Sequence, residues 1–292
     1  MSSPVFLLGT QRSGTTLLCR MLSAHPEVFI KNEVPVRSVF TPSADRDAIV
    51  AAIDHYVQRD YGMTIAALLA AEDKSVWGLK DPELTGYLDA LEQFLPEARF
   101  IVIVRDPRAV VRSYMENAWG LGTNAYTGAL RWRREVEAQL AFAKRHTGQV
   151  LVVCYESLVA APEDTLRAVC AHIGVSYSEK MLGYAEGKAY VEQKRESRHT
   201  FKAPDPALAT QWQSGLKRHE TKIINTVCAE LMDQLGYARL DVYQGLPAWV
   251  RGYYHLHQKV IGELQIQYRW RVGRYRRALR QWLVNTRARV VR

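Results

Sequence analysis

The sequence lacks the cysteine patterns of a zinc protein or of a disulfide-bonded secreted protein. Its 292 residues include only four cysteines, at positions 19, 154, 170 and 228, and none of them forms a Cys-x-x-Cys pair. Widely spaced cysteines predict reduced, mostly buried thiols. The histidines and acidic residues show no spacing typical of metal ligands either, so we expect no metal.

Long apolar runs are also missing. Outside the first predicted strand, the longest stretch of low charge covers residues 63–71, which is too short to cross a bilayer. The apolar run at the N-terminus is shorter than the hydrophobic region of a signal peptide. We therefore expect a cytoplasmic protein, peripheral at most to the inner face of the membrane.

Acidic residues are scarce in one segment only. The net charge is +9, but residues 251–292 alone contain eleven Lys and Arg and a single acid, Glu263. The remaining 28 basic and 29 acidic residues nearly balance. The high positive charge therefore belongs to the C-terminal segment, and we expect no nucleic-acid partner.

The N-terminal stretch has the order strand, glycine-bearing loop and helix. Residues 5–8 are apolar, residues 9–14 form a Gly-x4-Gly loop, and helical spacing begins at Thr15. This order directs backbone N–H groups and a helix N-terminus at a phosphate. An ATPase or kinase loop carries Lys where this chain has Thr15, and here the positive charge is Arg12, inside the loop. The loop therefore predicts a phosphate-like anion and argues against ordinary ATP hydrolysis.

Alternation of strands and helices predicts an α/β, phosphate-loop-like fold with a central, mainly parallel sheet and helices on both faces. We expect strands at residues 5–8, 28–30, 76–79, 100–104 and 150–153, and helices that include residues 45–73, 83–95, 129–145, 162–173 and 221–235. Ligands in such sheets bind beyond the carboxyl ends of the strands. The glycine loop, Lys80, Arg105 and Tyr155 are therefore predicted to converge at one edge.

A second anion site is predicted at Arg105 and Ser113. These residues lie eight positions apart, across the end of a predicted strand and the first turns of a helix that Asp106 and Pro107 would begin. Arginine binds phosphate through paired donors. Together with the glycine loop, this pair indicates a ligand with two separated anionic groups.

Five motifs together resemble those of the sulfotransferases that use 3′-phosphoadenosine 5′-phosphosulfate (PAPS). Their order and spacing are most similar to the branch that contains the protein-tyrosine sulfotransferases and many bacterial enzymes, and the resemblance covers about residues 4–238. The motifs are Gln11-Arg-Ser-Gly-Thr-Thr16, Ala24-His-Pro-Glu-Val28, Leu79-Lys-Asp-Pro82, Val104-Arg-Asp-Pro-Arg108 and Tyr155-Glu156.

The resemblance implies a binding role for several residues. The 5′-phosphosulfate would be held by the loop residues Gln11, Arg12, Ser13, Gly14, Thr15 and Thr16. Arg105 and Ser113 would bind the 3′-phosphate, and Tyr155 would line the nucleotide pocket. Ser197 and Lys202 are similar to a loop that closes over the donor. The expected product is adenosine 3′,5′-bisphosphate (PAP).

The resemblance also implies the catalytic groups. Glu33 would take the proton of the acceptor, and Lys80, assisted by Arg12, would neutralise charge on the leaving oxygen. Such roles suit an in-line attack on sulfur, because the nucleophile must lose a proton while negative charge grows on the phosphate. His199 is the alternative base that the sequence offers.

The predicted function is transfer of a sulfuryl group from PAPS to a hydroxyl, less often to an amine. Two alternatives stay open: a phosphate-loop nucleotide kinase, and a non-catalytic nucleotide-binding module anchored by its basic tail. Asn32 and Asn117 stand where the tyrosine-specific branch has an acid and an Arg. The acceptor, whether a small molecule, carbohydrate, lipid or peptide, and the oligomeric state therefore stay open.

Two segments are expected: a sulfotransferase domain at residues 1–240 and a basic, amphipathic helical extension at residues 241–292. In the extension, apolar residues recur at helical spacing beside arginines. Such a helix can lie on an anionic membrane. It can equally pack on the domain or on a second subunit, or recruit an anionic substrate.

Overall fold

The computed structural model describes residues 3–94, 96–185, 205–239 and 241–290, with residues 273–290 described by their backbone only. Contacts divide the chain into two compact units. The first comprises residues 1–110 and 132–214, and the second comprises residues 111–131 and 215–292. The sequence predicts a boundary at residue 240, between a sulfotransferase domain and a helical extension. The two compact units do not test that boundary, which stays a prediction.

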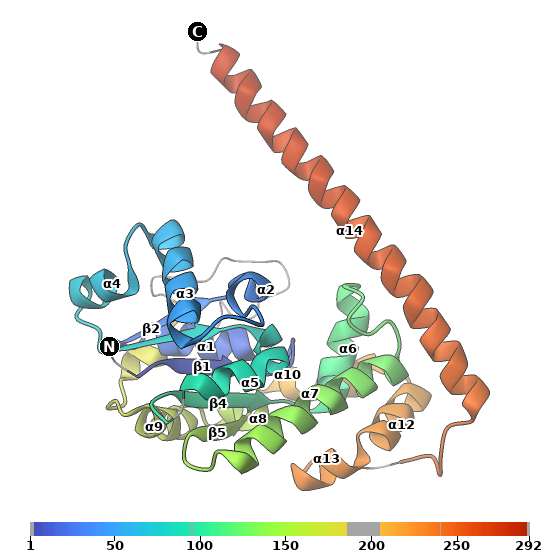
Figure 1. Cartoon of the computed structure of the whole chain (residues 1–292). Coiled ribbons are helices and arrows are strands. Elements are labelled where there is room, and N and C mark those ends of the chain that lie inside the picture. Colours follow the sequence, from blue (N-terminus) through green and yellow to red (C-terminus); the bar gives the residue numbers. More distant parts are fainter. Residues whose placement is uncertain (1–2, 95, 186–204, 240, 291–292) are drawn as a thin grey trace. The chain divides into compact units, whose positions relative to one another are not determined.

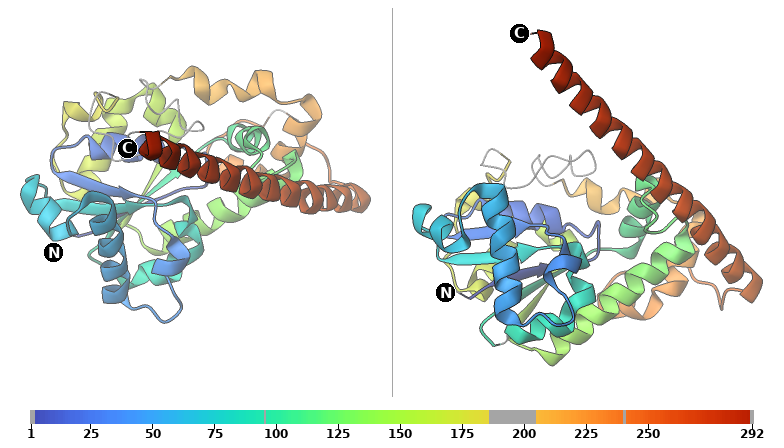
Figure 2. Two further views of the ribbon diagram at one scale, coloured as in Figure 1. Left: turned by 90° about the horizontal axis from the view of Figure 1, so that it is seen from above. Right: turned by 45° about the horizontal axis from the view of Figure 1, so that its top comes forward.

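The first unit contains a five-stranded sheet in the order β2-β3-β1-β4-β5, in which every neighbouring pair is parallel. The strands are β1 (Val5–Leu8), β2 (Val28–Asn32), β3 (Val76–Lys80), β4 (Arg99–Val104) and β5 (Val150–Cys154). Helices lie on both sides of the sheet (Figures 1 and 2). The predicted α/β fold is therefore confirmed.

The helices of the first unit follow the strands in alternation. They are α1 (Thr15–Ser23), α2 (Val36–Val39), α3 (Arg46–Tyr61), α4 (Ile65–Ala71), α5 (Leu88–Leu91), α8 (Tyr155–Ala160), α9 (Pro162–Ile173), α10 (Ala207–Thr210) and α11 (Trp212–Gly215). The helices α6 (Pro107–Asn117) and α7 (Ala125–Arg145) contribute residues to both units, as does α11 through its last residue, Gly215. The second unit also contains α12 (Arg218–Val227), α13 (Ala229–Gln234) and α14 (Ala248–Val290).

Some predicted helices were wrong in extent. The segment 83–95 is a 3-10 turn (Pro82–Tyr87), the short α5 and a second 3-10 turn (Glu92–Phe94). Gly86 lies within the first turn, where glycine disfavours a continuous α-helix. The segment 45–73 is divided because Gly62 ends α3 with a φ of 78° and Thr64 caps α4. The predicted helix 221–235 is likewise divided, into α12 and α13.

The sheet is buried on both faces, which explains its nearly continuous apolar strands. Alternate residues of β1, such as Leu7, belong to a core cluster with residues of α1, α8 and α9. On the other face, the ring of Phe6 lies 4.9 Å from that of Phe94 and 5.5 Å from that of Phe100. Phe100 contacts Phe142 of α7, with ring centroids 5.1 Å apart. Parallel strands packed in this way bring their carboxyl ends to one edge.

Candidate active site

The loop after β1 makes a tight turn into the N-terminus of α1. The backbone N–H and the hydroxyl of Ser13 both donate to the carbonyl of Thr10, at 3.1 and 2.8 Å. Arg12 and Gly14 have left-handed backbones, with φ of 72° and 104°. A Cβ at Gly14 would clash with the ring of Tyr155, so only glycine fits there. The first N–H groups of a helix have no intrahelical acceptor, and a turn of this geometry directs them outward from the end of β1, as an anion site requires.

Lys80 joins the phosphate loop to the predicted base. Its Nζ lies 2.9 Å from Oε1 of Glu33 and donates to Oγ1 of Thr16 at 3.2 Å. The Lys80 side chain is only 1% exposed, whereas that of Glu33 is 39% exposed. The N–H of Glu33 also donates to the carbonyl of Lys80 at 2.8 Å. The structure therefore brings together three predicted site residues from β2, β3 and α1.

Asp81 holds the turn that carries Glu33. Its Oδ2 accepts the N–H of Val34 at 3.2 Å, and its Oδ1 accepts the N–H of Glu83 at 2.9 Å. Glu33 itself has a left-handed φ of 55°, which a non-glycine residue adopts only when its surroundings impose it. Burial, aided by the charge of Glu33, raises the pKa of Asp81 to about 6.

Arg105 and Tyr155 form the other side of the site. The guanidinium carbon of Arg105 lies 4.1 Å from the centroid of the Tyr155 ring. Its Nη1 donates to the carbonyl of Arg12 at 3.3 Å and its Nη2 to that of Leu208 at 2.7 Å. The Nε atom is buried and has no hydrogen-bond partner among the described residues. Burial raises the pKa of Tyr155, which keeps this phenol neutral.

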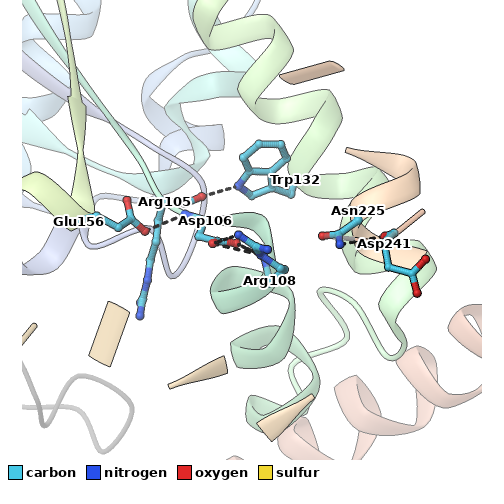
Figure 3. Close-up of polar contacts among 7 residues, drawn as sticks. All are labelled: Arg105, Asp106, Arg108, Trp132, Glu156, Asn225 and Asp241. Carbon is cyan, nitrogen blue, oxygen red and sulfur yellow. Dashed lines mark hydrogen bonds and ion pairs between the residues drawn. The ribbon is translucent and has the colours of Figure 1, made fainter. Parts of the chain in front are cut away.

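The backbone at Arg105 is fixed by buried polar contacts (Figure 3). Trp132 donates its Nε1–H to the carbonyl of Arg105 at 3.0 Å, and the N–H of Asp106 donates to Oε1 of Glu156 at 3.0 Å. The carboxylate of Asp106 accepts two or more bonds from the guanidinium of Arg108, the shortest 2.6 Å. It also accepts the backbone N–H of Arg108, so Asp106 caps α6 as predicted.

The other predicted residues belong to the second unit or lie outside the described residues. Ser113 lies on α6 in the second unit, where Nδ2 of Asn117 donates to its Oγ at 3.0 Å. In the same unit, Nδ2 of Asn225 donates to the carbonyl of Asp241 at 3.0 Å (Figure 3). Ser197, His199 and Lys202 lie outside the described residues.

Metal-ligand clusters and membrane-spanning helices are both absent from the described part of the chain. No group of three or more His, Cys, Asp or Glu side chains there is placed to hold a metal ion. No described helix combines the length and the hydropathy that a membrane span requires.

Sequence reasoning missed the positioning residues Asp81, Arg108 and Trp132. Asp81 directly follows Lys80 in the motif Leu79-Lys-Asp-Pro82, so its position beside a predicted catalytic lysine could have indicated a role in the site. For Trp132 no local signal existed, because its partner lies 27 residues away in the chain.

Comparison with known proteins identifies the family. The model of a family described as "Sulfotransferase family" matches residues 4–179. A putative protein-tyrosine sulfotransferase of Caenorhabditis briggsae is 27% identical over 203 residues, 62% of this chain and 69% of the relative. Nodulation protein NoeE of Sinorhizobium fredii is 26% identical over 277 residues, 80% of this chain and 65% of the relative. These relatives confirm the branch that the motifs indicated.

Solved structures agree on the fold. The sulfotransferase domain of the Synechococcus PCC 7002 olefin synthase matches with a TM-score of 0.61 and 21% identity, over 82% of this chain and 98% of that one. Mouse sulfotransferase SULT7A1, solved in complex with PAP, matches with a TM-score of 0.50 and 14% identity, over 79% of this chain and 84% of that one.

Proposed function

Because the chain belongs to the sulfotransferase family, whose members are transferases of sulfur-containing groups, we propose that it transfers a sulfuryl group from PAPS to a hydroxyl acceptor, with Glu33 as the base. The observation that carries this proposal is the position of Lys80. Its ammonium group contacts both the carboxylate of Glu33 and the hydroxyl of Thr16 at the phosphate loop, at 2.9 and 3.2 Å. A cation at this position would stabilise the negative charge that grows on the departing phosphate.

The donor is proposed from the two anion-binding features. The turn from Arg12 to Thr16 suits the 5′-phosphosulfate, because it combines a helix N-terminus with a guanidinium. The buried Nε of Arg105, which has no partner among the described residues, suits the 3′-phosphate. Ser113 would share that phosphate. The PAP complex of the mouse relative supports a nucleotide of this class.

Each residue then has a defined step. Glu33 accepts the proton of the acceptor hydroxyl while the acceptor oxygen forms its bond to sulfur. The bond between sulfur and the 5′-phosphate oxygen breaks, and Lys80, with Arg12, stabilises the charge that this oxygen gains. The products are a sulfate ester, PAP and protonated Glu33, which returns its proton to water. The partial exposure of Glu33 leaves room for the acceptor.

The acceptor class is proposed as a hydroxyl, with an amine less favoured. The relatives named protein-tyrosine sulfotransferases support a phenolic hydroxyl. Asn117, whose side chain is bonded to Ser113, stands where that branch carries Arg, so a protein tyrosine is one acceptor class among several. Small molecules, carbohydrates, lipids and peptides are the classes to screen.

The base can be tested with Glu33→Gln. Formation of PAP from PAPS is measured by chromatography against a panel of phenols, a tyrosine-containing peptide, sugars and amines. For the best acceptor, we expect kcat to fall by about 10²-fold or more, because a general base contributes about 10²–10⁴-fold. The affinity for PAP, measured by calorimetry, is expected to stay within about threefold.

The matched control is Glu97→Gln, which removes an exposed acid of the first unit whose contact with Arg46 is long, at 3.9 Å. It is expected to leave both quantities unchanged. Full turnover in Glu33→Gln would show that Glu33 is not the base, but it would not contradict the proposed sulfuryl transfer. Phosphoryl transfer from Mg-ATP by the wild type would contradict the transfer class itself.

A further inference from the structure

One face of the long helix α14 is hydrogen-bonded to other residues of the second unit. Oε1 of Gln258 accepts the N–H of Thr123 at 2.8 Å and the hydroxyl of Thr127 at 3.0 Å, and its Nε2 donates to the carbonyl of Gly120 at 2.7 Å. Oε1 of Gln265 accepts the N–H of Gly120 at 3.0 Å. These contacts tie residues 120–127 to the helix, so its first half is a fixed part of this unit.

The opposite face of α14 is apolar and exposed. Among the described residues, eight of the eleven exposed large apolar side chains lie on this helix. Five of them form a stripe along one face: Trp249, Tyr253, Leu256, Val260 and Leu264, which are 77%, 60%, 61%, 49% and 60% exposed. At about 100° per residue they fall within an arc of about 80°, and Gln258 lies on the other side of the helix.

This concentration differs from the scattered exposed apolar residues of an ordinary surface. The stripe runs about 22 Å along the helix at about 1.5 Å per residue. A contiguous exposed apolar stripe indicates a surface that something covers. Tyr268 and Trp270 are also exposed, but they lie outside this arc, one on either side of the stripe.

Charge decides what kind of surface covers the stripe. Residues 251–292 carry eleven Lys and Arg against one acid, Glu263. A second copy of this helix would bring the same excess of positive charge with only one acid, so two helices placed side by side would repel each other. An anionic surface attracts these groups instead, and each Lys or Arg near anionic lipids adds to the attraction.

We propose that α14 docks on a membrane surface that contains anionic lipids. The stripe, with Trp249 and Tyr253, inserts at the boundary between headgroups and acyl chains, where aromatic side chains are favoured. The basic C-terminal half neutralises the headgroups. The helix lies along the surface, since no described helix has the length and hydropathy of a membrane span. This docking does not depend on the reaction proposed above.

The test is co-sedimentation of the full-length chain with vesicles of phosphatidylcholine, with and without about 30% phosphatidylglycerol. We expect the anionic vesicles to bind at least tenfold more strongly, and high salt to weaken the binding because it screens the charges. The variant L256E/L264E is expected to lose at least tenfold in binding. The matched control L182E/V242E, which places the same charges at two exposed apolar positions outside α14, is expected to bind as the wild type does.

Circular dichroism and PAP affinity show whether each variant keeps its fold. Failure of the wild type to bind anionic vesicles would overturn the proposal. Equal binding of L256E/L264E and the control would overturn the role of the stripe. A wild-type dimer in light scattering that L256E/L264E converts to a monomer would assign the stripe to a second copy of the chain and overturn lipid docking.

Discussion

Replacing Asp81 by Asn is expected to make the variant progressively more stable, relative to the wild type, as pH rises toward neutral, while it lowers the activity. Asp81 is 5% exposed, and burial raises its pKa to about 6 from the ordinary value of 3.8. At 1.36 kcal/mol per pKa unit, ionising this carboxyl in the folded protein costs about 3 kcal/mol more than ionising it in the unfolded chain. Asn removes that cost because it does not ionise.

The sign of the pH effect follows from proton binding. Between about pH 4 and pH 6 the folded state binds more protons at Asp81 than the unfolded state, so the free energy of unfolding of the wild type falls as pH rises. The advantage of Asp81→Asn over the wild type should therefore grow by about 2 kcal/mol between about pH 4.5 and pH 7. At both pH values the variant also loses about 1–3 kcal/mol, because an amide has a single oxygen acceptor for the N–H groups of Val34 and Glu83.

The activity should change in the opposite direction. With one of these two bonds lost, the turn that holds Glu33 at a φ of 55° is no longer fixed, and we expect kcat to fall about tenfold with unchanged PAP affinity. Denaturant unfolding at the two pH values and PAP formation from PAPS measure the two effects. Asp89→Asn, at an exposed position of α5, is the matched control. A stability difference that does not change with pH would refute the raised pKa of Asp81. An unchanged kcat would refute its role in positioning Glu33.

Three further changes test other parts of the structure. Gly14→Ala should lower PAP affinity at least tenfold, measured by calorimetry, because a Cβ there would clash with Tyr155 and φ is 104°; unchanged affinity would mean that the loop does not bind the donor. Arg105→Ala should weaken PAP binding by about 10²-fold, since charge-assisted bonds to a phosphate would be lost, and an effect on kcat alone would contradict a binding role. Gln258→Leu should lower the free energy of unfolding by about 2 kcal/mol through its lost hydrogen bonds. Gln267→Leu should have little effect, because Gln267 is exposed and donates to Glu263 of its own helix; equal melting curves of the two variants would disprove the anchoring of residues 120–127.

Local patterns in the sequence, chiefly apolar runs, were enough to predict the sheet and half of the site. Apolar runs such as 76–79 and 100–104 predicted the buried strands, and the parallel order then placed Arg12, Lys80 and Arg105 at one edge. Lys80 ends β3, Arg105 follows β4 and Arg12 lies in the loop after β1, so knowing the strands was enough to group them.

What the sequence did not reveal depends on contacts between distant residues. The bond between Asp81 and Val34 joins positions 47 residues apart, and the one between Gln258 and Thr123 joins positions 135 apart. The hydrophobic periodicity of a sequence is a local pattern and does not indicate such distant pairs. The same holds for the left-handed backbone of Glu33, which neighbouring strand ends impose on a residue type that seldom adopts it.

The central claim, a PAPS-type nucleotide bound by the glycine loop and Arg105, is tested most directly by calorimetry. Purified protein is titrated with PAP in the absence of metal and, separately, with Mg-ATP. The account predicts a dissociation constant in the micromolar range or below for PAP, at least tenfold weaker binding in Arg105→Ala, and much weaker binding of Mg-ATP. Preferential binding of Mg-ATP, or no binding of either nucleotide, would contradict it.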